Sequence, residues 1–124
     1  MSPFAHLIRA LREKRNLRQN DAAVLLGYEQ SYLCALETSN KGTPKAEFIK
    51  LLIKRYNLNE EEIENLMDSL KRSKRRYVVP LKAKCEEYDL VYKLNEQLGK
   101  LTTNQILLMQ IALNSDVGNV ANFN

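Results

Sequence analysis

Apolar residues along this chain recur three and four positions apart, and short polar breaks separate the apolar stretches. This spacing places apolar side chains on one face of a helix, so the pattern predicts an all-α fold. Ser2-Pro3 and Thr43-Pro44 each pair a capping residue with a proline that suits a first helical turn, and Asn59 and Glu62 have the spacing of a capping box. We therefore predict five N-terminal helices, over residues 3–14, 19–26, 29–38, 44–56 and 59–70.

The segment from Gln19 to Leu36 carries the most specific pattern. Ala23 offers a small side chain midway along one predicted helix, where a second helix can approach closely. Gly27 can adopt the positive φ that ends this helix in a sharp turn. Leu33 and Leu36 lie three positions apart and share the face of the next helix that can pack under the first. This arrangement is typical of a helix-turn-helix, whose second helix commonly enters the major groove of DNA.

The composition changes after residue 70. Lys71 to Arg76 holds five basic residues and no acidic one, and the following stretch to Pro80 favours an extended or turn-like chain. We predict a helix-turn-helix domain over residues 1–70 and a basic linker over residues 71–80. Three interpretations of the basic run stay open: a solvated linker, an arm that adds contacts to DNA phosphates, or a recognition site for a partner.

Two further helices are predicted in residues 81–115. The first is expected to end at Gly99 and to have one apolar face, formed by Leu81, Cys85, Tyr88, Tyr92 and Leu94 or Asn95 to Leu98. The second begins at a capping box of Thr102 and Gln105 and is apolar on nearly every side. Residues 116–124, rich in Asn and close to the C-terminus, are predicted to be a flexible tail.

A helix that is apolar on every side has to be buried on every side, and one neighbouring helix cannot cover it. Packing back on the N-terminal helices is one solution, and packing against a second copy of the chain is the other. We predict the second, so that residues 81–115 form a helical dimerisation region. Its predicted contact residues are Tyr88, Tyr92, Ile106, Leu107, Met109, Ile111 and Leu113.

Composition and charge narrow the function classes further. The 124 residues carry a formal net charge of +4, too modest to identify a partner by itself. No apolar run reaches the roughly 18 residues of a membrane span, and Arg9 and Arg12 interrupt any signal-peptide core, so we expect a cytoplasmic protein with no membrane partner. Cys34 and Cys85 are expected to be free thiols, and with a single histidine, His6, they predict no metal site. Neither a nucleophile–base arrangement nor a phosphate-binding glycine loop is evident in the sequence, which predicts neither an enzyme nor a cofactor.

Several positions together resemble a known family. They are Leu17-Arg18-Gln19, Ala23, Gly27, Tyr32-Leu33, Leu36-Glu37 and Pro44. Their order and spacing are similar to those of the Cro/CI-like (XRE) helix-turn-helix family of phage and bacterial repressors, over residues 4–68. The resemblance implies a five-helix, lambda-repressor-like DNA-binding domain.

The resemblance also implies roles for individual residues. The residues that it places at base edges are Glu29, Gln30, Ser31 and Ala35. The residues that it places near DNA phosphates are Arg18, Gln19, Tyr32, Lys41, Thr43 and Lys45. Arg12 and Glu37 match a pair that forms a structural salt bridge. Gln30 is the strongest base reader of the set, because its amide can pair with adenine N6 and N7, whereas Ser31 and Ala35 discriminate weakly.

Two positions depart from the family pattern. Most members have Ser or Thr as the cap before the glutamine, where this chain has Arg18. Most members have Gly two residues after the glutamate that closes the second motif helix, where this chain has Ser39. We therefore expect a missing cap at Arg18 and a changed helix exit at Ser39.

The sequence predicts a sequence-specific transcriptional regulator, bound to double-stranded DNA at the nucleoid. In this prediction it is a dimeric repressor that reads a palindromic operator, of phage or mobile-element origin or acting on its own promoter. An anti-repressor, a protease or a toxin would be its protein partner. The alternative is an antitoxin or anti-repressor-type interaction protein whose C-terminal apolar helix binds another protein.

Overall fold

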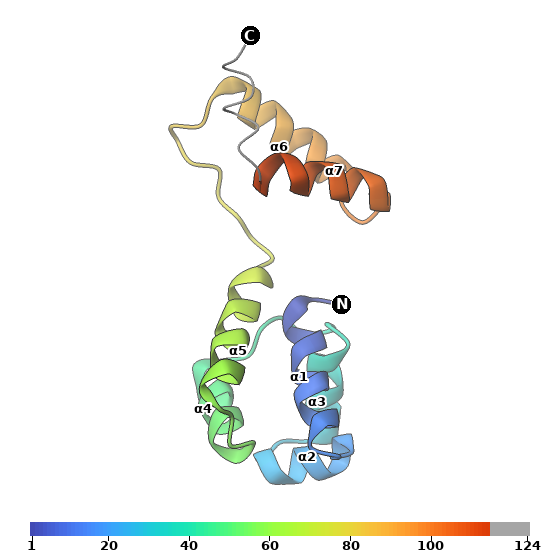
Figure 1. Cartoon of the computed structure of the whole chain (residues 1–124), viewed down its shortest axis with the longest axis vertical. Helices are drawn as coiled ribbons and strands as arrows, with labels where there is room; N and C mark the ends of the chain where they lie inside the picture. The colour runs from blue at the N-terminus through green and yellow to red at the C-terminus, as the bar shows by residue number, and fades with distance from the viewer. Residues whose placement is uncertain (115–124) are drawn as a thin grey trace. The chain divides into compact units, whose positions relative to one another are not determined.

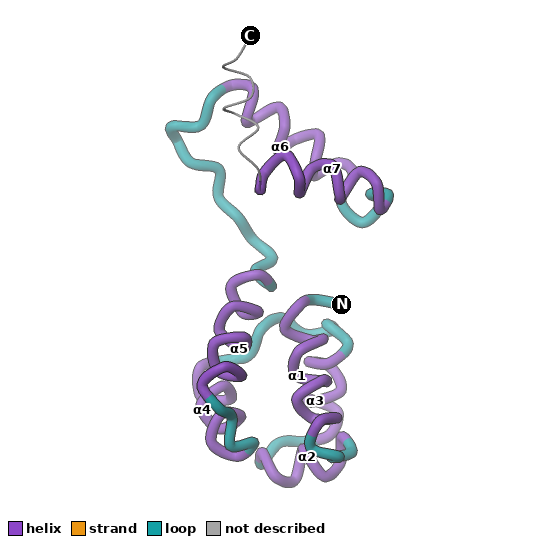
Figure 2. Tube along the Cα trace, in the orientation of Figure 1, coloured by secondary structure: helices purple, strands orange, loops and turns teal. Residues whose placement is uncertain are grey.

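The computed structural model describes residues 1–114, and over that range the chain contains α-helices and no strand (Figure 1; Figure 2). The predicted all-α fold is confirmed. The helices are α1 (Pro3–Lys14), α2 (Gln19–Leu26), α3 (Gln30–Glu37), α4 (Ala46–Arg55), α5 (Glu60–Arg72), α6 (Cys85–Gln97) and α7 (Thr103–Asn114). The chain divides into two compact units, one over Met1–Tyr77 and one that begins at Val78. The predicted tail over residues 116–124 lies outside the described residues.

The first unit has a hydrophobic core of its own. In it α1 packs against α5 and α3, and α2 packs against α3 and α4. Leu33 and Leu36 are buried on the core side of α3, as predicted. Ala22 and Ala23 are buried on α2, where their small side chains allow α2 and α3 to lie close together. The largest fully buried side chains come from four of the five helices: Phe4, Ile8, Leu33, Leu36, Phe48, Leu52 and Leu66.

Most helix ends are those that the sequence predicts. The Ser2 hydroxyl accepts a hydrogen bond from the Ala5 amide, and Gly27 ends α2 with a φ of +77°. At the start of α5 the Glu62 amide donates to Asn59 Oδ1 at 2.8 Å, and the Asn59 amide donates back to Glu62 Oε1 at 3.1 Å. The reciprocal bonds of Thr102 and Gln105 are present at the start of α7. These local signals act through short-range hydrogen bonds, which is why the sequence alone reveals them.

Two predicted boundaries in the first unit are wrong. The Thr43-Pro44 start of the fourth helix is not used, because the backbone stays extended through Lys45 and α4 begins at Ala46. Phe48 and Ile49, in the first turn of this helix, lie in the core. The fifth helix does not stop at residue 70 but continues through Arg72, into the predicted linker, and Ser73 closes it.

The start of the sixth helix is also corrected. Leu81 is 97% exposed and lies in a turn in which the Ala83 amide donates to the Pro80 carbonyl. The helix begins four residues later, where the Lys84 amide donates to Glu87 Oε1 at 3.2 Å. Gly99, with a φ of +88°, follows the end of α6 as predicted.

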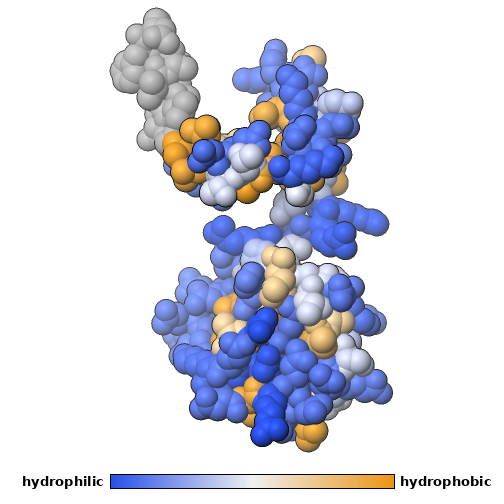
Figure 3. All heavy atoms as spheres, turned by 90° about the vertical axis from the view of Figure 1, so that its right-hand side faces the viewer, coloured by the Kyte–Doolittle hydropathy of each residue, from blue (hydrophilic) through white to orange (hydrophobic). Residues whose placement is uncertain are grey.

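The second unit consists of α6 and α7, and neither helix contains a fully buried residue. Hydrophobic side chains therefore lie open on its surface (Figure 3). An apolar groove of about 300 Å³ runs along the pair, lined mainly by Leu90, Leu94, Leu101, Leu108 and Met109. Tyr88 and Tyr92 lie on a different side of α6 from this groove, because they are two residues, or about 200°, away from Leu90 and Leu94. None of the helices over residues 1–114 is long and apolar enough to cross a membrane.

Candidate nucleic-acid interface

The third helix has one face in the core and one face in solvent. Leu33, Leu36 and Glu37 are buried, whereas Glu29, Gln30 and Ser31 at its N-terminal end are exposed. Ala35, one turn after Ser31, is half-buried. The buried residues fix the helix on the first unit, so the predicted base-reading residues are presented on a rigid element rather than on a loop.

A continuous chain of hydrogen bonds holds Gln30 in place. Gln30 Nε2 donates to Gln19 Oε1 at 2.9 Å, and Gln19 Nε2 donates to Glu37 Oε1 at 3.2 Å. Because the Glu37 carboxylate can only accept, it sets the direction of the Gln19 amide, and Gln19 in turn sets that of Gln30. Gln30 keeps its own Oε1 and one Nε2 hydrogen for another partner. The spacing of Gln19 and Gln30 in the sequence contains no signal for this bond.

The predicted pair of Arg12 and Glu37 stands at the buried end of this series of hydrogen bonds. Arg12 Nε and Nη2 donate to the two oxygens of the Glu37 carboxylate at 2.8 Å and 2.9 Å. The hydrogen bonds that Arg12 donates to Glu37 raise the pKa of Arg12 above its already high usual value. Arg12 Nη1 also donates to the Leu17 carbonyl at 2.8 Å, which ties α1 to the segment before α2. Breaking the pair would leave a charge buried without its partner.

The start of α2 lacks a side-chain cap, as the resemblance predicted for Arg18. Asp21 compensates in part, because its Oδ2 accepts a hydrogen bond from the Arg18 amide at 3.3 Å. The Arg18 side chain is exposed at this helix end. Asp21 was not among the predicted residues, although an acidic residue three positions after the cap has the spacing of a capping box.

The exit from α3 does not change as expected at Ser39. This residue has a φ of +64°, the left-handed conformation that a glycine would adopt there, and its hydroxyl accepts a hydrogen bond from the Ser2 amide at 2.8 Å. The amides of Asn40 and Lys41 both donate to the Ala35 carbonyl, at 2.9 Å and 3.3 Å. The loop after α3 is therefore closed onto the helix, and the prediction of an altered exit is wrong for the backbone.

An aromatic cluster supports the loop between α3 and α4. The rings of Tyr28 and Tyr32 stack with centroids 5.0 Å apart, and both meet Phe48 edge-on. Lys41 Nζ lies 5.1 Å from the centroid of the Tyr32 ring, within range of a cation–π contact. Burial raises the pKa of Tyr32. The Tyr32 ring therefore positions Lys41, and Thr43 and Lys45 lie exposed along the same loop.

A model of the family described as "Helix-turn-helix domain" matches residues 3–66. The chain belongs to the helix-turn-helix domain family. The match spans α1 to α4 and the first half of α5, and it confirms the resemblance to XRE-type helix-turn-helix proteins.

One curated relative carries a similar segment. The protein named uncharacterized HTH-type transcriptional regulator RghRB, of Bacillus subtilis strain 168, is 40% identical over 52 residues. The aligned segment covers 42% of this helix-turn-helix chain and 37% of the relative, so it spans little more than a third of that protein. No solved structure matches the chain.

Proposed function

We propose that this protein is a DNA-binding transcriptional regulator that reads base edges through the exposed face of α3. The observation that carries the proposal is the chain from buried Glu37 through Gln19 to Gln30, which holds a recognition side chain at the start of an exposed helix. The remaining Oε1 and Nε2 hydrogen of Gln30 are the acceptor and donor that adenine N6 and N7 require. A side chain oriented before binding loses less entropy when it binds.

The phosphate contacts are proposed to lie on both sides of this reading face. Gln19 stands at the N-terminus of α2, where backbone N–H groups and the helix dipole favour an anion, and Arg18 precedes it. Lys41, Thr43 and Lys45 follow α3 on the loop that is bonded back to Ala35. These contacts would fix the register of α3 on the duplex, and base contacts would select the sequence.

We further propose that the regulator acts as a homodimer and represses transcription by covering a promoter. The support is the second unit, whose apolar side chains are left uncovered by its own two helices. Two copies would read a palindrome with half-sites about one helical turn, roughly 10 base pairs, apart. The predicted contact residues Tyr88, Tyr92, Ile106, Leu107, Ile111 and Leu113 are exposed, and Met109 is half-buried.

A gel shift with the DNA upstream of the gene tests the reading of bases. Gln30→Ala should weaken binding to the recognised site about 10- to 100-fold, the cost of one bidentate base contact, and should bind unrelated DNA as the wild type does. Asn65→Ala removes an amide from the exposed side of α5 and is the matched control. Equal affinity of Gln30→Ala and the wild type for the recognised site would overturn the assignment of Gln30.

A second candidate function rests on the groove along α6 and α7. An antitoxin or anti-repressor-type protein would use this apolar surface to hold another protein instead of a second copy. The mass of the purified chain in solution separates the two functions. A stable dimer of the chain alone supports the regulator, and a one-to-one complex with the product of a neighbouring gene supports the interaction protein.

A further inference from the structure

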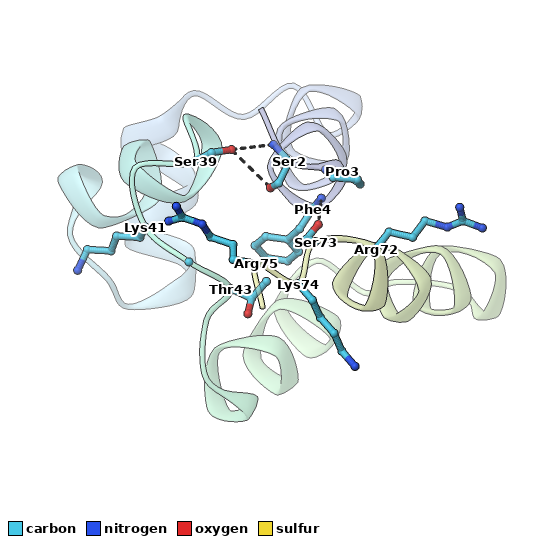
Figure 4. A pocket seen from close by; sticks show the side chains of 11 residues that line it. Ser2, Pro3, Phe4, Ser39, Lys41, Thr43, Arg72, Ser73, Lys74 and Arg75 are labelled. Atoms are coloured by element: carbon cyan, nitrogen blue, oxygen red, sulfur yellow. Dashed lines mark hydrogen bonds between the residues drawn. The ribbon is translucent and has the colours of Figure 1, made fainter. Parts of the chain in front are cut away.

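A basic pocket lies beside the α3–α4 loop, in the first unit. It has a volume of about 370 Å³ and is formed by the start of α1, the loop after α3 and the segment that follows α5 (Figure 4). Four of the residues that line it are basic, Lys41, Arg72, Lys74 and Arg75, and none is acidic. A concave surface with one sign of charge concentrates counter-ions of the opposite sign.

Ser73 fixes the chain at this pocket. Its hydroxyl accepts a hydrogen bond from the Phe4 amide at 2.9 Å and donates one to the Ser69 carbonyl at 2.7 Å, and the residue is buried. The Phe4 amide lies in the first turn of α1, where backbone N–H groups have no hydrogen-bond acceptor within their own helix. This bond therefore joins the end of α5 to the start of α1, and it holds the next residues against the domain.

The anchor at Ser73 divides the basic run into two parts. Lys71 and Arg72 belong to the last turn of α5, and Arg72 Nε forms an ion pair with Asp68 Oδ2 at 2.7 Å. In Figure 4 the Arg72 side chain points away from the pocket, whereas Arg75 extends toward the α3–α4 loop and Lys41. Within residues 1–114, neither Arg75 nor Lys41 forms an ion pair. Arg72 thus has an acidic partner, whereas Arg75 and Lys41 have none among the described residues.

We propose that Arg75, together with Lys41 and Thr43, binds a phosphate of the DNA backbone beside the half-site that α3 reads. This inference rests on the proposed function. The loop that carries Lys41 is bonded through its amides to the Ala35 carbonyl, so one side of the pocket is held against the helix that carries the reading residues. An arginine can donate two parallel hydrogen bonds to a phosphate, and Thr43, which also lines the pocket, adds a hydroxyl donor.

The salt dependence of DNA binding tests this contact. The full chain is titrated with a duplex of about 30 base pairs from the upstream DNA, which is long enough for two half-sites. A scrambled duplex of equal length is titrated in parallel, and both titrations are repeated at several NaCl concentrations. Arg75→Gln should reduce the slope of log K, where K is the DNA association constant, against log salt concentration by about 0.9 for each subunit bound. The variant should lose the same affinity for both duplexes, because a phosphate contact carries no sequence information. Arg75→Lys keeps the charge and should retain the wild-type slope.

Arg9→Gln is the matched control, because it makes the same change in charge at an exposed arginine of α1 that forms an ion pair with Glu13 and does not line the pocket. It should bind both duplexes with the wild-type slope, and circular dichroism of every variant checks that the helices are intact. An equal reduction of the slope in both variants would mean that only net charge matters, and would overturn the inference. A wild-type slope in Arg75→Gln, with binding still dependent on Gln30, would overturn this inference alone. Absence of DNA binding by the wild-type chain would overturn the proposed function as well.

Discussion

The two units bury their apolar residues to very different extents. In the first, Leu33 and Leu36 are 1% and 2% exposed, whereas in the second Leu108 and Leu113 are 67% and 81% exposed. The difference shows that an apolar helix pattern predicts that a helix is buried, but does not predict which surface buries it. In the first unit the cover is intramolecular, and in the second we propose that it is a second copy.

The largest effect should come from opening the core of the first unit. Leu36→Ala removes a fully buried side chain, and we expect the free energy of unfolding of this unit to fall by about 2–5 kcal/mol. Urea titration followed by circular dichroism measures the loss. Leu113→Ala makes the same change at an exposed position and should alter the stability of the first unit by less than about 0.5 kcal/mol. A similar loss in both variants would contradict the comparison.

A charge introduced on α7 should weaken association of two copies of the chain without opening the core of the first unit. Ile111→Asp places a carboxylate in the proposed dimer interface, and we expect the dissociation constant of the dimer to rise by about 30-fold or more, equivalent to about 2 kcal/mol. Sedimentation equilibrium measures this constant. Val24→Asp introduces the same charge at an exposed apolar position of α2 and should leave the mass in solution unchanged. If the wild-type chain is a monomer at all concentrations, the proposed role of the second unit is wrong.

The smallest effect concerns pH and is confined to the first unit. Hydrogen bonds from Arg15 and from the Asn59 amide lower the pKa of Glu62, and Lys14 adds a favourable charge. A lowered pKa in the folded state stabilises the fold above the ordinary glutamate pKa of about 4.3, and this contribution is lost as the pH falls through the lower folded value. Glu62→Gln should be less stable at neutral pH and should lose less stability in acid.

The melting temperature of the first unit between neutral and acidic pH checks this expectation. Glu64→Gln is the matched control, because Glu64 is exposed on the same helix and forms no ion pair within residues 1–114. It should follow the wild-type pH dependence. Identical profiles for Glu62→Gln and the wild type would show that the contacts of Glu62 add no stability.

Local capping and turn signals in the sequence predicted several helix ends. The caps at Ser2, Asn59 and Thr102 and the turn at Gly27 were predicted correctly, because each acts within about four residues. One such signal is not used. Thr43-Pro44 is a good local helix start, but the backbone stays extended through Lys45 and α4 begins at Ala46.

The helical period, the helix-turn-helix spacing and the residue types on the reading helix follow from the order of the amino acids. Which of these residues work together depends on how the helices pack. The bond between Gln19 and Gln30 crosses two helices, and the bond between Phe4 and Ser73 joins residues 69 positions apart. The bond at Ser73 also divides the basic run, because the chain that follows it turns Arg75 toward the loop after α3. Helix periodicity is set by neighbours along the chain, whereas these contacts depend on how the helices pack around Leu33 and Leu36.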